Sequence, residues 1–249
     1  AIATSPPGND LLAQGPAGLD LGLEGWYYKT YDTGGKEVRM MRAKRLLVPL
    51  LVLAAGICSL GGAQQEWLPT VVINEVGWMG TAASYADEWL ELYNITDYAI
   101  DLSGWTLSWG EGEVTIHFSE VTEATKEIRN SIIPAHGFYI LERTDDETIS
   151  DIVADLIYKG ALDNGGGSLI LRDARGNTVD TANIDGGEWP AGTASKGEPP
   201  YASMERISAT LPDTDANWGT NDGKNRNGLD AKGNPLNGTP GQPNSVSGS

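Results

Sequence analysis

The sequence has very few of the side chains that hold transition metals or form disulfide bonds. Among its 249 residues there is one cysteine, Cys58, and there are two histidines, His117 and His136. A Cys/His zinc site needs three or four such ligands, so a site of this kind can hardly be assembled. The fold must therefore rely on its hydrophobic core.

Basic side chains are also scarce, with 17 lysines and arginines against 34 aspartates and glutamates, a formal net charge of −17. A surface of this sign repels phosphate groups and anionic lipid headgroups. After residue 63 the basic residues are scattered, with no cluster of four or more. Direct binding of nucleic acid is therefore disfavoured.

The longest apolar run lies near the start, and its surroundings have the layout of a secretory signal peptide. A basic stretch at 40–45 precedes an uncharged run at 46–57, and small residues follow. We predict a signal peptide over 40–63, cleaved between Ala63 and Gln64. The mature protein would then be secreted or held in the cell envelope, with no membrane span of its own.

Two alternatives to cleavage remain open. The 18 residues from Leu46 to Ala63 carry no charge, which is near the lower limit for a membrane-spanning helix. Cys58 lies at a depth typical of a lipoprotein, although Ile57 rather than a small residue precedes it.

Residues 1–39 stand in front of this predicted signal peptide. Codons for residues 36–38 can spell a bacterial ribosome-binding sequence just before Met40 or Met41. We therefore interpret 1–39 as the product of a misassigned start, with a real disordered extension as the alternative. The nucleotide sequence tests this hypothesis.

Removing the first 63 residues hardly changes the charge. They hold six basic and five acidic residues, so 64–249 keeps 11 basic and 29 acidic residues, a formal charge of about −18. This part has no cysteine, and its 186 residues are enough to bury a substantial core.

Residues 64–249 contain short runs in which apolar and polar residues alternate, as in β-strands, and Gly, Pro, Asn and Asp bound these runs. In the stretch 88–93, Leu90 and Leu92 point to one face and Glu91 to the other. Eight or nine such runs predict an all-β protein with a β-sandwich. The predicted strands are 71–76, 88–93, 105–109, 114–118, 138–141, 152–158, 168–173, 178–180 and 203–207.

Two other segments complete this organisation. The stretch 120–129 is charged on most sides and predicts a helix in a surface insertion. The segment from residue 219 onward is rich in Asn, Gly, Asp and Pro, so we expect it to wrap loosely over the sandwich. The predicted domain is 64–244, followed by a disordered tail at 245–249.

Five segments stand out in this region: Ile73–Gly80, Asp87–Asn94, Ile100–Leu107, Leu162–Asp173 with the following 176–180, and the closing Gly238–Asn244. In their order and spacing they resemble the bacterial lamin-tail domain. The resemblance covers about 70–244. It implies an immunoglobulin-like sandwich of non-catalytic type, often found on exported bacterial proteins.

The sequence contains no recognisable catalytic constellation. His117 and His136 are isolated, and no Gly-x-Ser-x-Gly nucleophile motif is present. Neighbouring acidic residues such as Asp87 and Glu88 give no sign of a pair facing across a cleft. We therefore predict that the protein is not an enzyme and requires no cofactor.

Calcium is the one metal that the loops could hold. Asp213, Asp215 and Asn217 offer oxygen atoms at alternate positions, as the first half of a calcium loop does. Trp218 takes the place of the glycine of an EF-hand, so the motif is incomplete. The candidate ligands are Asp163, Asp213, Asp215, Asn217 and Asp222, although turn formation also explains these residue types.

Four tryptophans lie beside Gly or Pro, where loops are expected. Exposed indoles stack on sugar rings, so these residues are the candidate ligand-binding set, although plugging the ends of the sandwich would also account for them. They are Trp78, Trp109, Trp189 and Trp218.

These observations together predict an exported, non-enzymatic module for binding, adhesion or association with the envelope. Its partner would be an extracellular or envelope protein or a glycan. The alternatives are an accessory domain to a secreted hydrolase or nuclease, and a calcium-stabilised carbohydrate-binding module.

Overall fold

The computed structural model describes residues 29–31, 37–39 and 69–247. The chain divides into two units, 1–62 and 63–249. In the first unit, β1 (Lys29–Tyr31) pairs antiparallel with β2 (Glu37–Arg39). The predicted signal peptide at 40–63 and its cleavage site lie outside the described residues, as does the rest of the predicted leader.

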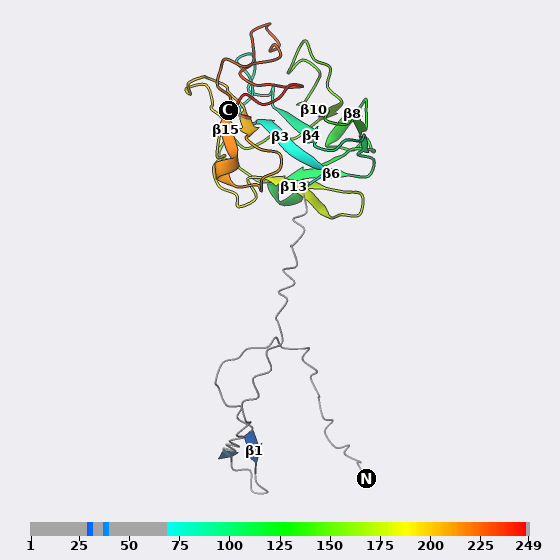
Figure 1. Cartoon of the computed structure of the whole chain (residues 1–249), viewed down its shortest axis with the longest axis vertical. Helices are drawn as coiled ribbons and strands as arrows, with labels where there is room; N and C mark the ends of the chain where they lie inside the picture. Colours follow the sequence, from blue (N-terminus) through cyan, green and yellow to red (C-terminus); the bar gives the residue numbers. More distant parts are fainter. Residues whose placement is uncertain (1–28, 32–36, 40–68, 248–249) are drawn as a thin grey trace, which may run out of the picture. The chain divides into compact units, whose positions relative to one another are not determined.

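The regular secondary structure of the second unit is almost entirely β-strand (Figure 1). Its larger sheet has seven strands in the order β15-β14-β3-β4-β10-β11-β8. In that order they are β15 (Trp218–Thr220), β14 (Met204–Arg206), β3 (Val71–Gly77), β4 (Trp89–Asn94), β10 (Phe138–Arg143), β11 (Leu156–Tyr158) and β8 (Thr125–Ile128). All neighbours are antiparallel except β10 and β11.

A second sheet of four antiparallel strands has the order β13-β12-β6-β7. Its strands are β13 (Thr178–Ala182), β12 (Leu169–Arg172), β6 (Thr106–Trp109) and β7 (Val114–His117). Smaller elements are the pair β5 (Ile100–Asp101) and β9 (Ile132–Ile133), and the 3₁₀ turns η1 (Gly110–Gly112) and η2 (Asp215–Asn217). The predicted all-β sandwich is confirmed.

The hydrophobic core joins the two sheets. Leu90 and Leu92 of β4 belong to one buried cluster with Leu107 of β6 and Leu171 of β12. All four side chains are fully buried. Their alternation along each strand places them on one face, so the apolar period of two that the sequence shows accounts for the inner surfaces of both sheets.

The predicted helix at 120–129 is wrong. This segment contains β8, the edge strand of the seven-stranded sheet, which pairs with β11. Thr125 is buried and its hydroxyl oxygen accepts a hydrogen bond from the backbone N–H of His117, while Lys126 and Glu127 are exposed. Charges around a short segment fit a solvent-facing edge strand as well as they fit a surface helix.

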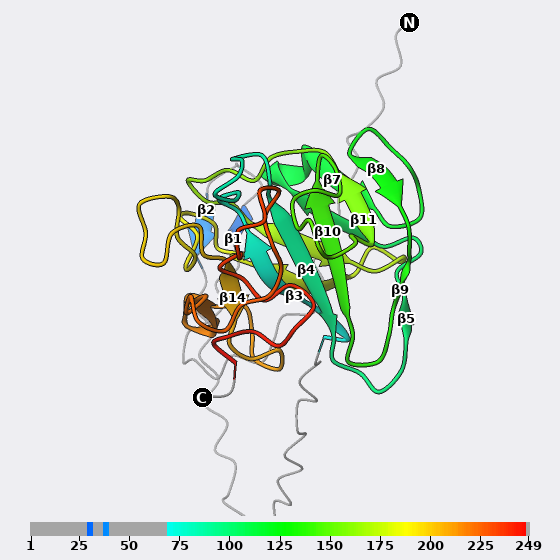
Figure 2. The ribbon, with the colours of Figure 1, turned by 90° about the horizontal axis from the view of Figure 1, so that it is seen from above.

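The C-terminal segment folds back over the outer face of the seven-stranded sheet, where it crosses β3 and β4 (Figure 2). The hydroxyl of Ser245 donates to Glu205 at 2.6 Å, and Val246 lies beside Gly219. Residues 245–247 therefore pack on the domain, although the sequence placed them in a disordered tail; 248 and 249 lie outside the described residues.

Within the described ranges, no helix has the length and apolar character needed to cross a membrane.

Candidate functional site

Three of the four candidate tryptophans are buried side chains. Trp78, Trp109 and Trp218 expose only 5–7% of their surface. The indole N–H of Trp78 donates to the backbone oxygen of Ala191 at 3.0 Å, and one face of Trp218 is covered by the Arg206 guanidinium at 4.5 Å. The hypothesis that Trp78 and Trp218 are open sugar platforms is therefore wrong, because neither offers a free ring face.

Trp189 is the most exposed of the four, and it shares a hollow with Trp109. The hollow has a volume of about 290 Å³ and is also lined by Glu113 and Asp163. Both indole N–H groups are occupied, since Trp109 donates to the oxygen of Ala161 and Trp189 to that of Asp163. The structure thus brings together two candidate tryptophans and one candidate calcium ligand.

The candidate calcium ligands satisfy nearby protein donors instead. Asp213 accepts bonds from the hydroxyl of Thr181, the backbone N–H groups of residues 183 and 184, and the indole of Trp218. Asn217 links the loop 208–212 through its amide, with the Nδ2 group donating to three carbonyl oxygens. Both side chains fix loops.

The other candidate ligands cap turns. Asp222 accepts from the backbone N–H groups of Lys224 and Asn225, and Asp163 accepts from that of Gly165. Within the part of the chain that the structure describes, no three acidic, histidine or cysteine side chains are grouped closely enough to hold a metal ion. The five candidate oxygen donors therefore do not form one site.

The two histidines lie on different elements. His117 ends β7 and is half-buried, whereas His136 lies in the turn before β10 with a positive φ of 52°. Its Nε2 atom lies 2.8 Å from Asp97, and both groups are exposed. Neither imidazole adjoins a nucleophile in this geometry.

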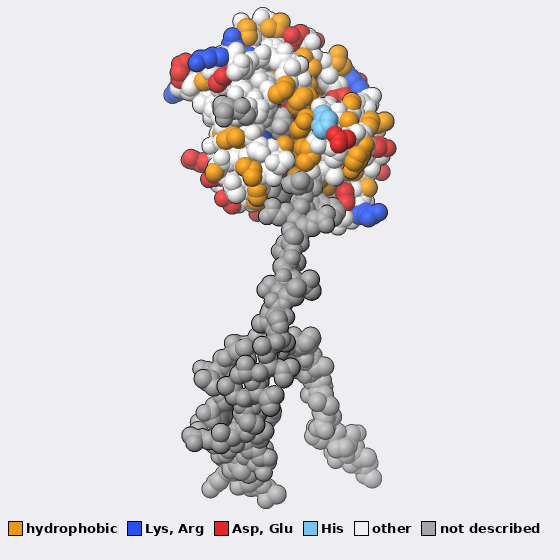
Figure 3. Space-filling model, in the orientation of Figure 1, with side chains coloured by type: hydrophobic (Ala, Val, Ile, Leu, Met, Phe, Trp, Pro, Cys, Tyr) orange, Lys and Arg blue, Asp and Glu red, His pale blue; other side chains and the backbone are white. Residues whose placement is uncertain are grey.

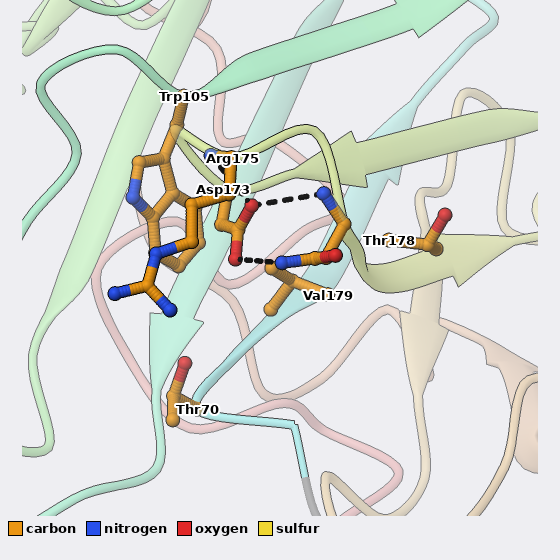
Figure 4. A pocket seen from close by; sticks show the side chains of 7 residues that line it. Thr70, Trp105, Asp173, Arg175, Thr178 and Val179 are labelled. Carbon is orange, nitrogen blue, oxygen red and sulfur yellow. Dashed lines mark hydrogen bonds between the residues drawn. The ribbon is translucent and has the colours of Figure 1, made fainter.

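A cleft with a volume of about 460 Å³ lies beside Trp105. Its walls come from three segments: Thr70 precedes β3, Trp105 precedes β6, and Arg175 lies in the β12–β13 turn (Figure 4). Val179 supplies apolar surface and Thr178 a hydroxyl group. We call this hollow the Trp105 cleft.

The turn that carries Arg175 is held rigid by Asp173. The carboxylate accepts from the backbone N–H groups of Arg175 and Asn177 and from the Asn177 side chain, all at 2.8–2.9 Å (Figure 4). These bonds lower the pKa of Asp173 below its ordinary value. Among the described residues Arg175 forms no ion pair, so its exposed guanidinium remains available at the mouth of the cleft.

The structure also places three glutamates in a line that sequence reasoning missed. Glu75 on β3 has Glu91 on β4 and Glu205 on β14 as its directly opposed partners. All three are fully buried, and we call them the carboxyl row. A glutamate at the centre of an otherwise uncharged strand, as in 71–77, was the signal available in the sequence.

Other ionisable side chains of the domain are buried as well. Burial raises the pKa of Glu88 to about 7 against the opposing effect of Arg143, and that of Glu142 to about 8. Arg206 reaches the other way, toward the four-stranded sheet, where it forms an ion pair with Asp180 at 2.7 Å. Burial raises the pKa of Asp180 to about 6, although Arg206 acts to lower it.

Two packed, mainly antiparallel sheets with a common core define an immunoglobulin-like β-sandwich. Residues 65–185 match the family model of the lamin tail domain. These residues therefore form a lamin tail domain, as the sequence motifs implied.

The match ends well before the packed domain does. Residues 186–247 lie beyond it and supply β14, β15 and the segment over the carboxyl row. The likeness of Gly238–Asn244 to a family ending thus stays a prediction. A search of curated proteins gave no match to the chain.

Proposed function

We propose that this chain is an exported, non-catalytic binding module that docks a partner protein of the cell envelope at the Trp105 cleft. The lamin tail domain supports a binding role, and the layout of 40–63 supports export. The observation that carries the proposal is the cleft itself, about 460 Å³ in volume, with an indole and an exposed guanidinium at its walls.

The chemistry of the cleft favours one kind of partner segment. Trp and Arg are the side chains most often found at the energetic centres of protein interfaces. Trp105 and Val179 would take an apolar side chain, while Arg175 would pair with a carboxylate next to it. Acidic side chains are spread over the face shown in Figure 3, so the local positive charge of Arg175 would select the register of an acidic segment.

Charge reversal tests the proposal without disturbing the core. The full chain, as Arg175→Glu and as Lys196→Glu, would be immobilised and exposed to envelope extract of the source cells. Both side chains are exposed, so both variants should fold. We expect one bound protein to be lost only with Arg175→Glu; equal retention or equal loss in both variants would contradict the proposal.

A second candidate function is glycan binding at the Trp109–Trp189 hollow. The observation in its favour is that two indoles meet the carboxylates of Asp163 and Glu113 there, and carboxylates accept hydrogen bonds from sugar hydroxyls. A glycan array with Trp189→Ala and Trp105→Ala separates the two sites. Glycan binding lost with Trp189→Ala alone would favour this candidate.

A further inference from the structure

The carboxyl row would be an unfavourable arrangement if all three groups were ionised. Glu75 stands between Glu91 and Glu205 on adjacent strands, and all three have no exposed surface. Like charges directly opposite each other destabilise a sheet, and buried charges without a counter-ion cost far more. The neighbouring Arg206 turns its guanidinium to Asp180, on the four-stranded sheet.

The segment that covers the row contributes only uncharged donors. We call residues 238–246 the clasp. The backbone N–H groups of Thr239 and Gly241 donate to Glu75 and Glu91, at 2.9 and 2.5 Å. The clasp holds no acidic, basic or histidine residue, so Glu91 on β4 and Glu205 on β14 are the titratable groups that face Glu75.

The contacts of the Thr239 hydroxyl need one more hydrogen than the hydroxyl itself carries. The Thr239 hydroxyl oxygen lies 3.0 Å from Glu75 Oε2 and 2.9 Å from Glu205 Oε1. A hydroxyl has one hydrogen to donate, whereas an ionised carboxylate can only accept. One of these two contacts therefore needs a proton on the glutamate.

The remaining contacts show which glutamate carries the proton. Glu205 already accepts from Asn221 at 2.6 Å, from the hydroxyl of Ser245 at 2.6 Å and from the N–H of Val246 at 3.2 Å, so donors already occupy both of its oxygens. The Oε2 atom of Glu75 has Thr239 as its one partner, while its Oε1 atom takes the donors from Ser203 and Thr239. A proton on Oε2 of Glu75 gives each of the two short contacts of Thr239 its own hydrogen, while Asn244 Oδ1, 3.4 Å from the same hydroxyl, accepts from Asn74 instead.

We propose that Glu75 holds a structural proton, which it donates to Thr239 while Thr239 donates to Glu205, and that losing this proton at alkaline pH releases the clasp. Without it, two acceptor oxygens face the same hydroxyl, and the two neighbouring carboxyls add repulsion. The clasp is then held to the sheet by fewer hydrogen bonds, whereas the hydrogen bonds between the strands beneath it remain. The device is a pH-sensitive cover on the outer face of β3, β4 and β14.

The direction of the pKa shift agrees with this arrangement. Burial, followed by the charges of Glu205 and Glu91, raises the pKa of Glu75 well above its ordinary value. A carboxyl whose pKa is higher in the folded than in the unfolded state stabilises the fold at low pH. That contribution is lost as the pH rises through the folded-state value.

Glu75→Gln is the decisive variant, because an amide can copy the protonated acid. Its NH₂ group would donate to Thr239, and its oxygen would accept from Ser203. Hydrogen exchange of peptides covering 238–246 would be followed from about pH 6 to about pH 9 on the full chain, corrected for intrinsic exchange. Glu127→Gln, at an exposed position of β8, is the matched control.

We expect clasp protection in the natural protein to fall at least about tenfold over this range, and to fall at least about threefold less in Glu75→Gln, in which Glu91 still titrates. The control should follow the natural protein. Flat protection in the natural protein, equal pH dependence in Glu75→Gln, or failure of Glu75→Gln to fold would each overturn the proposal. Carboxyl-carbon NMR of the natural protein adds a measurement that needs no variant: a Glu75 carboxylate ionised at neutral pH would also overturn it.

Discussion

The seven-stranded sheet has two buried faces that differ in chemistry. The inner face presents Leu90 and Leu92 to the other sheet, and hydrophobic contact holds it. The outer face presents Glu91 and its row partners, and hydrogen bonds from the clasp hold it. Burial by itself therefore does not show what stabilises a face. Apolar packing stabilises the inner face, whereas the outer face depends on the protonation of its carboxyl groups and on the number of hydrogen-bond donors that meet them.

The largest expected effect is a fall in the free energy of unfolding as the pH rises. Burial raises the pKa values of Glu88 to about 7 and of Glu91 and Glu142 to about 8, so their stabilisation is complete below the unfolded value and lost as the pH rises through 7–8. Urea unfolding should therefore give a free energy that falls from about pH 5 to about pH 9.

Exposed carboxyls act in a different pH window. The pKa values of Asp173 and Asp222 are lowered by turn hydrogen bonds, so their contribution is present above the unfolded value and lost as the pH falls through the folded one. Maximum stability should thus lie on the mildly acidic side of neutrality. A maximum above about pH 8 would contradict the assignment of raised values to the buried groups.

Removing Arg206 should have the next largest effect. Arg206→Ala leaves Asp180 buried without its partner and removes the bonds to the carbonyl oxygens of Ile73 and Thr181, at an expected cost of about 3–5 kcal/mol. Arg226→Ala, at an exposed position, should cost less than about 0.5 kcal/mol. Equal losses in denaturant unfolding would show that the buried ion pair has no special role.

The inner face should respond to loss of volume. Leu92→Ala should reduce the unfolding free energy by about 2–5 kcal/mol, because a fully buried side chain leaves a cavity. Leu211→Ala, at a leucine that is 55% exposed, is the matched control and should change little. In contrast to the outer face, the loss for Leu92→Ala should be the same at acidic and alkaline pH.

The smallest change is expected from Glu142→Gln. Among the described residues, the Oε1 atom of Glu142 has no hydrogen-bond partner, and the Oε2 atom accepts from Ile149 at 3.3 Å. The unfolding free energy near pH 5 should therefore shift by less than about 1 kcal/mol, while its decline toward about pH 9 becomes shallower. An unchanged decline would show that Glu142 does not titrate in this range.

The inner face could be predicted from the sequence because alternation along a strand is a local property. Leu90 and Leu92 were assigned to one face and Glu91 to the other, as the structure has them. Alternation does not say what covers the second face. Glu91 is covered by a segment that begins well over 100 residues later, so no local pattern could show its burial.

The candidate site was predicted less well, for a similar reason. Tryptophans beside glycine are expected in exposed loops, but the indole of Trp78 donates to Ala191, 113 residues away, and Trp218 is held by the carboxylate of Asp213 and the guanidinium of Arg206. The Trp105 cleft was missed because its walls meet only after the hairpin of 169–182 packs beside the start of β3.

The bonds between Asn74 and Asn244 link residues 170 positions apart, at opposite ends of the domain. Contacts of such long sequence separation form late in folding, since most of the chain must be ordered before they can be made. The outer face thus stays uncovered until residues 238–246 have been synthesised and have docked on the sheet. A chain shortened before residue 238 would therefore leave three glutamates facing water.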